Sequence, residues 1–95
     1  MSKDVRYQVA IELQAGASGA DVWADYYEYE DGTADVVLSY ASDDVNPRER
    51  VIKRVRYYAP DLLSNDDVRE NAIETALDCA MAVFGWIDCI EVYEF

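Results

Sequence analysis

The chain has 95 residues, and its 20 acidic and 8 basic residues give a formal net charge of −12. This length is typical of one small domain, and 52% hydrophobic residues is too many for a disordered chain. Nucleic acids and anionic membranes bind clustered Lys and Arg, so we expect neither as a direct ligand. No apolar run reaches the roughly 20 residues that span a bilayer, and no secretory signal is recognisable. We therefore predict a single acidic domain over residues 1–95, located in the cytoplasm.

Three segments in the first half of the chain have the pattern of β-strands. Residues 5–13 alternate between apolar and polar side chains, as a strand with one buried face does. Residues 22–30 and 33–41 are rich in aromatic and β-branched side chains. Asp31-Gly32 between these two runs predicts a hairpin with a type I′ turn.

Residues 48–58 are predicted to form a fourth strand, in which the sign of the charge is reversed. This strand holds five of the eight basic residues, namely Arg48, Arg50, Lys53, Arg54 and Arg56. We expect them to pair across the sheet with acidic neighbours, because such pairing removes like-charge repulsion. Alternatively, they form a positive face that meets an acidic patch of a partner or of a second copy, so a homodimer is possible.

A helix is predicted between Ser64, a suitable N-cap, and Gly85, a suitable left-handed C-cap. Apolar residues recur in this segment at spacings of three and four and mark one buried face. They are Val68, Ala72, Ile73, Ala76, Leu77, Ala80, Val83 and Phe84.

Residues 86–95 follow as a last strand, with Ile87, Cys89, Tyr93 and Phe95 on the face expected to be buried. The element order is then β-β-β-β-α-β. Each element has one apolar side to cover, so the simplest packing is a mostly antiparallel sheet of about five strands with one helix on a face. The predicted fold class is α+β.

Several kinds of active site lack their residues in this sequence. It contains no histidine, the commonest general base and metal ligand. The two cysteines have no metal-ligand spacing and are expected to be buried free thiols, and the four glycines fit turns and a helix cap. We therefore expect no catalytic residues, no metal site and no cofactor, and a protein that is not an enzyme.

Residues 21–44 include eight acidic residues and no Lys or Arg. Carboxylates held on a hairpin can imitate the regular negative charge of a nucleic-acid backbone, and interleaved tyrosines add flat contact area. Acids spaced three or four apart on the helix form a second acidic stripe. The predicted partner-binding residues are Asp21, Asp25, Tyr27, Glu28, Tyr29, Glu30, Asp31, Asp35, Asp43 and Asp44, with Glu70 and Glu74 on the helix.

The charge is segregated: residues 21–47 carry −8, residues 48–56 carry +4 and residues 57–95 carry −8. The complement of such a surface is a basic protein surface, as on a nucleic-acid-binding protein or complex. In size and acidity the chain is similar to phage-encoded inhibitors of host defence, the anti-restriction and anti-CRISPR proteins. That similarity implies a DNA mimic acting in the host cytoplasm.

Two alternatives stay open. In size and acidity the chain is equally similar to the immunity proteins that neutralise nuclease toxins. A generic acidic interaction domain, or a surface adapted to high salt, would account for the composition without a decoy role.

Overall fold

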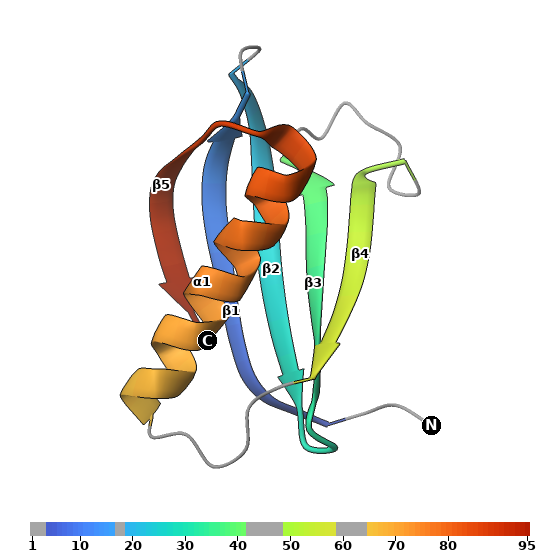
Figure 1. The fold of residues 1–95 in the computed structure, drawn as a ribbon, viewed down its shortest axis with the longest axis vertical. Helices are drawn as coiled ribbons and strands as arrows, with labels where there is room; N and C mark the ends of the chain where they lie inside the picture. Colours follow the sequence, from blue (N-terminus) through green and yellow to red (C-terminus); the bar gives the residue numbers. More distant parts are fainter. Residues whose placement is uncertain (1–3, 17–18, 42–48, 59–64) are drawn as a thin grey trace.

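The computed structural model describes residues 4–16, 19–41, 49–58 and 65–95 and contains a five-stranded sheet crossed by one helix (Figure 1). Along the chain the elements are β1 (Val5–Ala15), β2 (Ala20–Tyr29), β3 (Thr33–Tyr40), β4 (Val51–Tyr58), α1 (Asn65–Phe84) and β5 (Ile87–Glu94). The strand order is β4-β3-β2-β1-β5, and every neighbouring pair is antiparallel. The predicted α+β fold is therefore confirmed. No helix within these ranges combines the length and apolar composition needed to cross a membrane.

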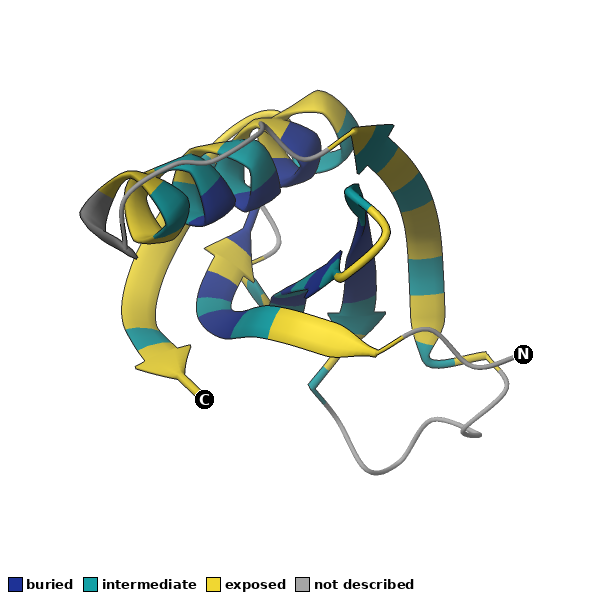
Figure 2. Cartoon of the chain, turned by 90° about the horizontal axis from the view of Figure 1, so that it is seen from below, coloured by how far each residue is buried: buried dark blue, intermediate teal, exposed yellow. Residues whose placement is uncertain are grey.

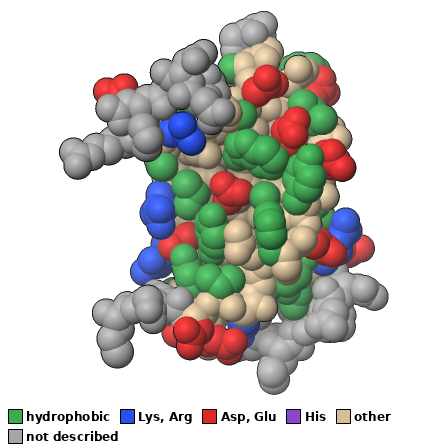
Figure 3. Space-filling model, turned by 180° about the vertical axis from the view of Figure 1, so that it is seen from behind, with side chains coloured by type: hydrophobic (Ala, Val, Ile, Leu, Met, Phe, Trp, Pro, Cys, Tyr) green, Lys and Arg blue, Asp and Glu red, His purple; other side chains and the backbone are tan. Residues whose placement is uncertain are grey.

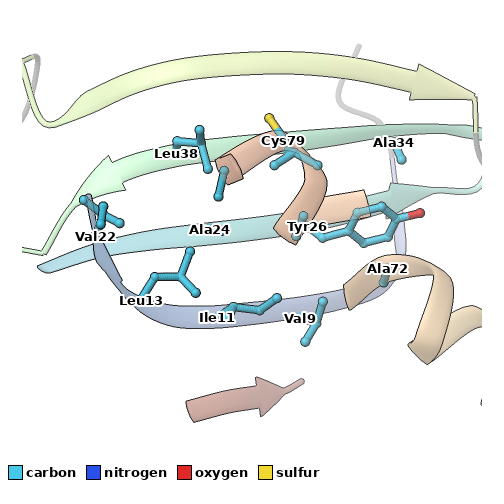
Figure 4. Packing of buried hydrophobic residues seen from close by; sticks show 14 residues of the cluster. Val9, Ile11, Leu13, Val22, Ala24, Tyr26, Ala34, Leu38, Ala72 and Cys79 are labelled. Atoms are coloured by element: carbon cyan, nitrogen blue, oxygen red, sulfur yellow. The ribbon is translucent and has the colours of Figure 1, made fainter. Parts of the chain in front are cut away.

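The core lies between α1 and the face of the sheet that α1 covers. Alternate residues of the three central strands point into it, including Ile11 of β1, Tyr26 of β2 and Leu38 of β3, each at most 1% exposed (Figure 4). The helix contributes mainly small side chains, Ala72, Ala76, Cys79 and Ala80. Small side chains let a helix approach a sheet closely, and the buried residues accordingly gather where α1 faces β1 to β3 (Figure 2).

Gly85 ends α1 as predicted. Its φ of 77° lies in the left-handed region that favours glycine, and its N–H donates to the Met81 carbonyl oxygen at 2.8 Å. The predicted N-cap, Ser64, lies outside the described residues.

The β2–β3 hairpin is present, but the predicted two-residue turn is wrong. Three residues, 30–32, connect the strands, and the Gly32 N–H donates to the Tyr29 carbonyl oxygen at 3.2 Å. Gly32 has a φ of 86°, as in three-residue hairpins that end on a left-handed residue. The Asp31 carboxylate fixes the turn by accepting hydrogen bonds from the Thr33 N–H at 3.0 Å and the Thr33 hydroxyl at 2.6 Å.

The prediction that Tyr93 and Phe95 share the buried face of the last strand is also wrong. In the register between β5 and β1, Ile90 is an extra residue without a partner. Such a bulge reverses the alternation of side chains beyond it. Val92 therefore packs against the core, whereas Tyr93 and Phe95 turn to the other face of the sheet.

The two cysteines are free thiols, as predicted, but only one of them is buried. Cys79 is on the buried side of α1, in the core, whereas Cys89 is exposed on β5. The expected burial of Cys89 is therefore wrong, because β5 is an edge strand and most of its residues are exposed.

Candidate functional site

Glu28, one of the residues predicted to contact a partner, is instead buried, with 3% of its surface exposed. Its position in β2 points it to the core side, where Oε1 accepts a hydrogen bond from the Tyr26 hydroxyl at 2.7 Å. Oε2 accepts from Arg6 Nε, also at 2.7 Å. A carboxylate satisfied in this way stabilises the fold and is not available to a partner.

Asp35 is likewise buried, although it points to the sheet face opposite α1. Arg56 donates to it from Nε at 2.9 Å and from Nη2 at 3.2 Å, and the Tyr29 hydroxyl donates at 3.1 Å. Arg54 Nη1 lies 3.7 Å from the same carboxylate. The expected cross-sheet pairing of basic residues in β4 is thus confirmed for Arg54 and Arg56. The hydrogen bond from Arg56 is the main cause that lowers the pKa of Asp35 below its usual range.

Asp35→Asn is expected to lower the free energy of unfolding by about 1 kcal/mol at pH 7, a modest figure because the arginine partners are largely exposed. The pKa of Asp35 is lower in the folded state, so the carboxylate stabilises the fold above its unfolded pKa, and this contribution is lost in acid. Urea denaturation of both proteins at pH 7 and pH 3 checks this. An equal difference at both pH values would contradict it.

The remaining acidic residues of the predicted hairpin surface lie too far apart to form one patch. Asp21 is exposed at the start of β2, whereas Glu30 and Asp31 are exposed in the turn after its end. An extended strand of this length separates them by roughly 30 Å. Asp43 and Asp44 lie outside the described residues.

The acidic stripe on the helix forms a separate surface. Glu70 and Glu74 are exposed on α1, and so are Asp67 and Asp78. Because α1 covers one face of the sheet, this stripe and the side chains on the opposite face lie on different sides of the molecule (Figure 1). The two predicted acidic surfaces therefore do not form one patch.

The sheet face opposite α1, here called the open face, receives the odd-numbered residues of β2, including Asp25, Tyr27 and Tyr29. Figure 3 shows hydrophobic side chains gathered over this face, with acidic side chains among them. Over β2, β1 and the edge strand β5 it has a shallow depression of about 380 Å³, here called the aromatic hollow. It is lined by Ala10, Trp23, Asp25, Tyr93 and Phe95.

Asp25 is the carboxylate of the aromatic hollow. Its neighbours across the sheet are Ala10 of β1 and Val37 of β3, both buried. Within the described residues its carboxylate has no hydrogen bond or ion pair. Burial among these apolar groups raises the pKa of the Asp25 carboxyl from 3.8 to about 6.

Asp25→Asn is expected to stabilise the protein by about 1 kcal/mol at pH 7.5, after the pKa shift is discounted for partial exposure to solvent. The folded pKa lies above the unfolded one, so in the wild type stability falls as the pH rises through the range 4 to 6. The advantage of the variant therefore grows over this range and is small at pH 4. Thermal unfolding at pH 4 and 7.5 measures it, and a pH-independent advantage would contradict the burial argument.

Part of the open face lies outside the predicted partner-binding residues. Trp23 and Tyr93 pack with ring centroids 5.6 Å apart and an interplanar angle of 50°. Glu12 lies directly opposite Glu91 across β1 and β5. The alternation within β2 already placed Trp23 beside Asp25, but the contributions of β1 and β5 depend on the strand order and on the bulge at Ile90.

Most arginines in the described residues are held by a few carboxylates. Arg6 pairs with Glu28, Arg54 and Arg56 pair with Asp35, and Arg69 pairs with Glu94. Eleven other acids form no ion pair with a described residue; they are Asp4, Glu12, Asp21, Asp25, Glu30, Glu49, Glu70, Glu74, Asp78, Asp88 and Glu91. The negative charge is thus concentrated on the outside of the fold.

Where the structure is described, no group of three or more His, Cys, Asp or Glu side chains is arranged to hold a metal ion. Comparisons with protein families, with curated proteins and with solved structures gave no match.

Proposed function

We propose that this chain is a non-enzymatic binding protein of the cytoplasm. Its exposed acids dock on the basic surface of a nucleic-acid-binding protein or complex and thereby keep nucleic acid away from it. One observation carries the proposal: Glu28 and Asp35, both buried, engage three of the described arginines, while Asp21, Glu70 and Glu74, all exposed, form no ion pair with a described residue.

The energetic cost of this arrangement supports a role for the charge. A large net charge destabilises a compact fold by self-repulsion, and arginines placed among the exposed acids would relieve it. Here Arg6 and Arg56 instead hydrogen-bond carboxylates that are almost inaccessible to solvent. The exposed acids are left to attract and orient a basic partner, which raises the association rate and favours the correct partner.

The open face is the proposed primary contact. It combines Asp21, Asp25 and Glu12 with the aromatic side chains that protein interfaces favour. The stripe of Glu70 and Glu74 on α1 is the proposed secondary contact, on the other side of the molecule. Immunity against a nuclease toxin would use the same surfaces, and the identity of the captured protein distinguishes it from a defence inhibitor.

A matched pair of double variants tests the proposal. Glu12→Gln/Asp21→Asn removes two charges from the open face, and Glu70→Gln/Glu74→Gln removes two from α1. We expect the first variant to capture less than about a tenth of the partner that the wild type captures from a lysate, and the second to keep most of it. Capture by the wild type should be lost at about 0.5 M salt.

Two outcomes would contradict the proposal. In one, both variants capture as much as the wild type. In the other, the captured proteins do not bind nucleic acid. A surface that is merely adapted to high salt would give neither a specific partner nor a difference between the two variants.

A further inference from the structure

In the aromatic hollow a partly buried carboxylate lies among aromatic rings, and no cation of the described residues pairs with it. Its wall includes Trp23 and Tyr93, which already contact each other, and Phe95, which is 75% exposed. Asp25 lies beside these rings with no ion pair to any described residue. Removing a carboxylate from water without pairing it costs free energy. A cation bound in the hollow would offset this cost.

The basic strand of the chain itself does not complete the hollow. In the sheet register Val37 lies between Asp25 and Arg54, and Arg54 is directed to Asp35 at 3.7 Å. Glu12 and Glu91 face each other on the neighbouring strands and add further negative charge near the hollow. None of the described basic side chains pairs with Asp25, and we infer that a cation from another molecule does so.

The chemistry of the hollow indicates which cation fits. A Mg²⁺ or Ca²⁺ ion needs several oxygen ligands, but Asp25 is the only lining residue with a carboxylate. A lysine ammonium is compact and strongly hydrated, so it gains little from aromatic walls. A guanidinium is planar and weakly hydrated, stacks on aromatic faces and pairs with a carboxylate.

We propose that the aromatic hollow receives an arginine side chain of a basic protein partner, whose guanidinium pairs with Asp25 and stacks on Trp23 and Tyr93. This inference rests on the proposed function, because it takes the partner to be a basic protein. The bound arginine would act as the anchor of the interface. It would give specificity to a contact that otherwise depends on long-range electrostatic attraction.

The affinity of the hollow for the arginine side chain is expected to depend on pH. Charged and titratable groups near Asp25 come from every strand of the sheet: Glu12 of β1, Tyr27 of β2, Asp35 of β3, Arg54 of β4, and Glu91 and Tyr93 of β5. Of these, the tyrosine pKa values are raised, so Tyr27 and Tyr93 stay neutral below pH 9. Binding should therefore weaken as the pH falls from 7 to 5 and Asp25 takes up a proton.

A peptide titration tests the anchor directly. Trp86→Phe leaves Trp23 as the sole tryptophan, so its fluorescence reports on the hollow. The probe is a peptide of four arginines, and a peptide of four lysines is the chemical control. In this background, Asp25→Asn should weaken binding of the arginine peptide at least tenfold. The matched control, Asp88→Asn, removes the same charge from an exposed residue of β5 that does not line the hollow and should change binding less than threefold.

Three results would overturn the inference. Equal effects of Asp25→Asn and Asp88→Asn would mean that the peptide is held by long-range electrostatic attraction alone. Equal binding of the lysine peptide, with the same change in Trp23 fluorescence, would remove the case for a guanidinium. A wild-type dimer that Asp25→Asn dissociates, seen by sedimentation, would assign the hollow to a second copy.

The two proposals fail separately. If Asp25→Asn still captures the nucleic-acid-binding partner in full, the anchor is wrong and the acidic surface stands. If the arginine peptide binds the hollow but captured partners do not bind nucleic acid, the proposed function is wrong and the anchor stands.

Discussion

Glu28→Ala is expected to lower the free energy of unfolding by about 3 kcal/mol, a large share of the 5–15 kcal/mol typical of a small domain. The substitution removes the carboxylate that accepts the hydrogen bond of the Tyr26 hydroxyl. Tyr26 is only 1% exposed, so water cannot replace this acceptor. It also leaves Arg6 without its carboxylate. Because the Arg6 side chain is 32% exposed and partly solvated by water, the expected loss of stability is at the lower end of the range for a broken buried ion pair.

Glu30→Ala is the matched control. It removes the same charge two residues along the chain, from an exposed position in the turn, and should change stability by less than about 0.5 kcal/mol. Urea denaturation followed by circular dichroism measures both variants. A Glu28→Ala protein as stable as the Glu30→Ala protein would contradict the structural role assigned to Glu28.

Leu38→Ala is expected to cost about 3 kcal/mol, within the range found when buried leucines are truncated. Leu38 is fully buried on β3, beneath α1, in the cluster that includes Ala76 and Cys79 (Figure 4). The cavity cannot be filled by a shift of α1 alone, since the same helix also packs against β1 and β2. The midpoint of thermal unfolding should fall by more than roughly 10 °C.

Ile90→Ala removes a similar side chain from the bulge of β5, where 48% of Ile90 is exposed, and should cost less than about 1 kcal/mol. Thermal unfolding of the two variants under one condition is the comparison. Similar losses of stability in the two variants would contradict the placement of Leu38 in the core.

The sequence was sufficient to predict the elements and their general packing. The period of two in β1 and the spacing of three and four in α1 are local patterns that reflect which side is buried, and the structure buries Ile11 and Ala76 accordingly. The bulge at Ile90 could not be predicted in this way, because it depends on the pairing of β5 with β1 and not on composition. Tyr93 was assigned to the wrong face for that reason.

The burial of Glu28 and Asp35 was not predictable from residue type, since carboxylates are rarely buried unless paired. Their partners are distant in sequence: Arg6 is 22 residues from Glu28, and Arg56 is 21 residues from Asp35. The aromatic hollow depends in the same way on tertiary structure, because Trp23 and Tyr93 meet across the intervening strand β1. What the sequence did show is that acids and tyrosines alternate along β2.

The central claim is that this chain and a nucleic acid compete for one basic surface, and a competition measurement tests it most directly. The protein captured by the chain is bound to a labelled DNA or RNA duplex, and this chain is added at constant salt. We predict that the duplex is released completely, with the concentration for half release rising in proportion to the duplex concentration. The Glu12→Gln/Asp21→Asn variant should need at least tenfold more protein. A stable ternary complex of captured protein, duplex and this chain would contradict the account.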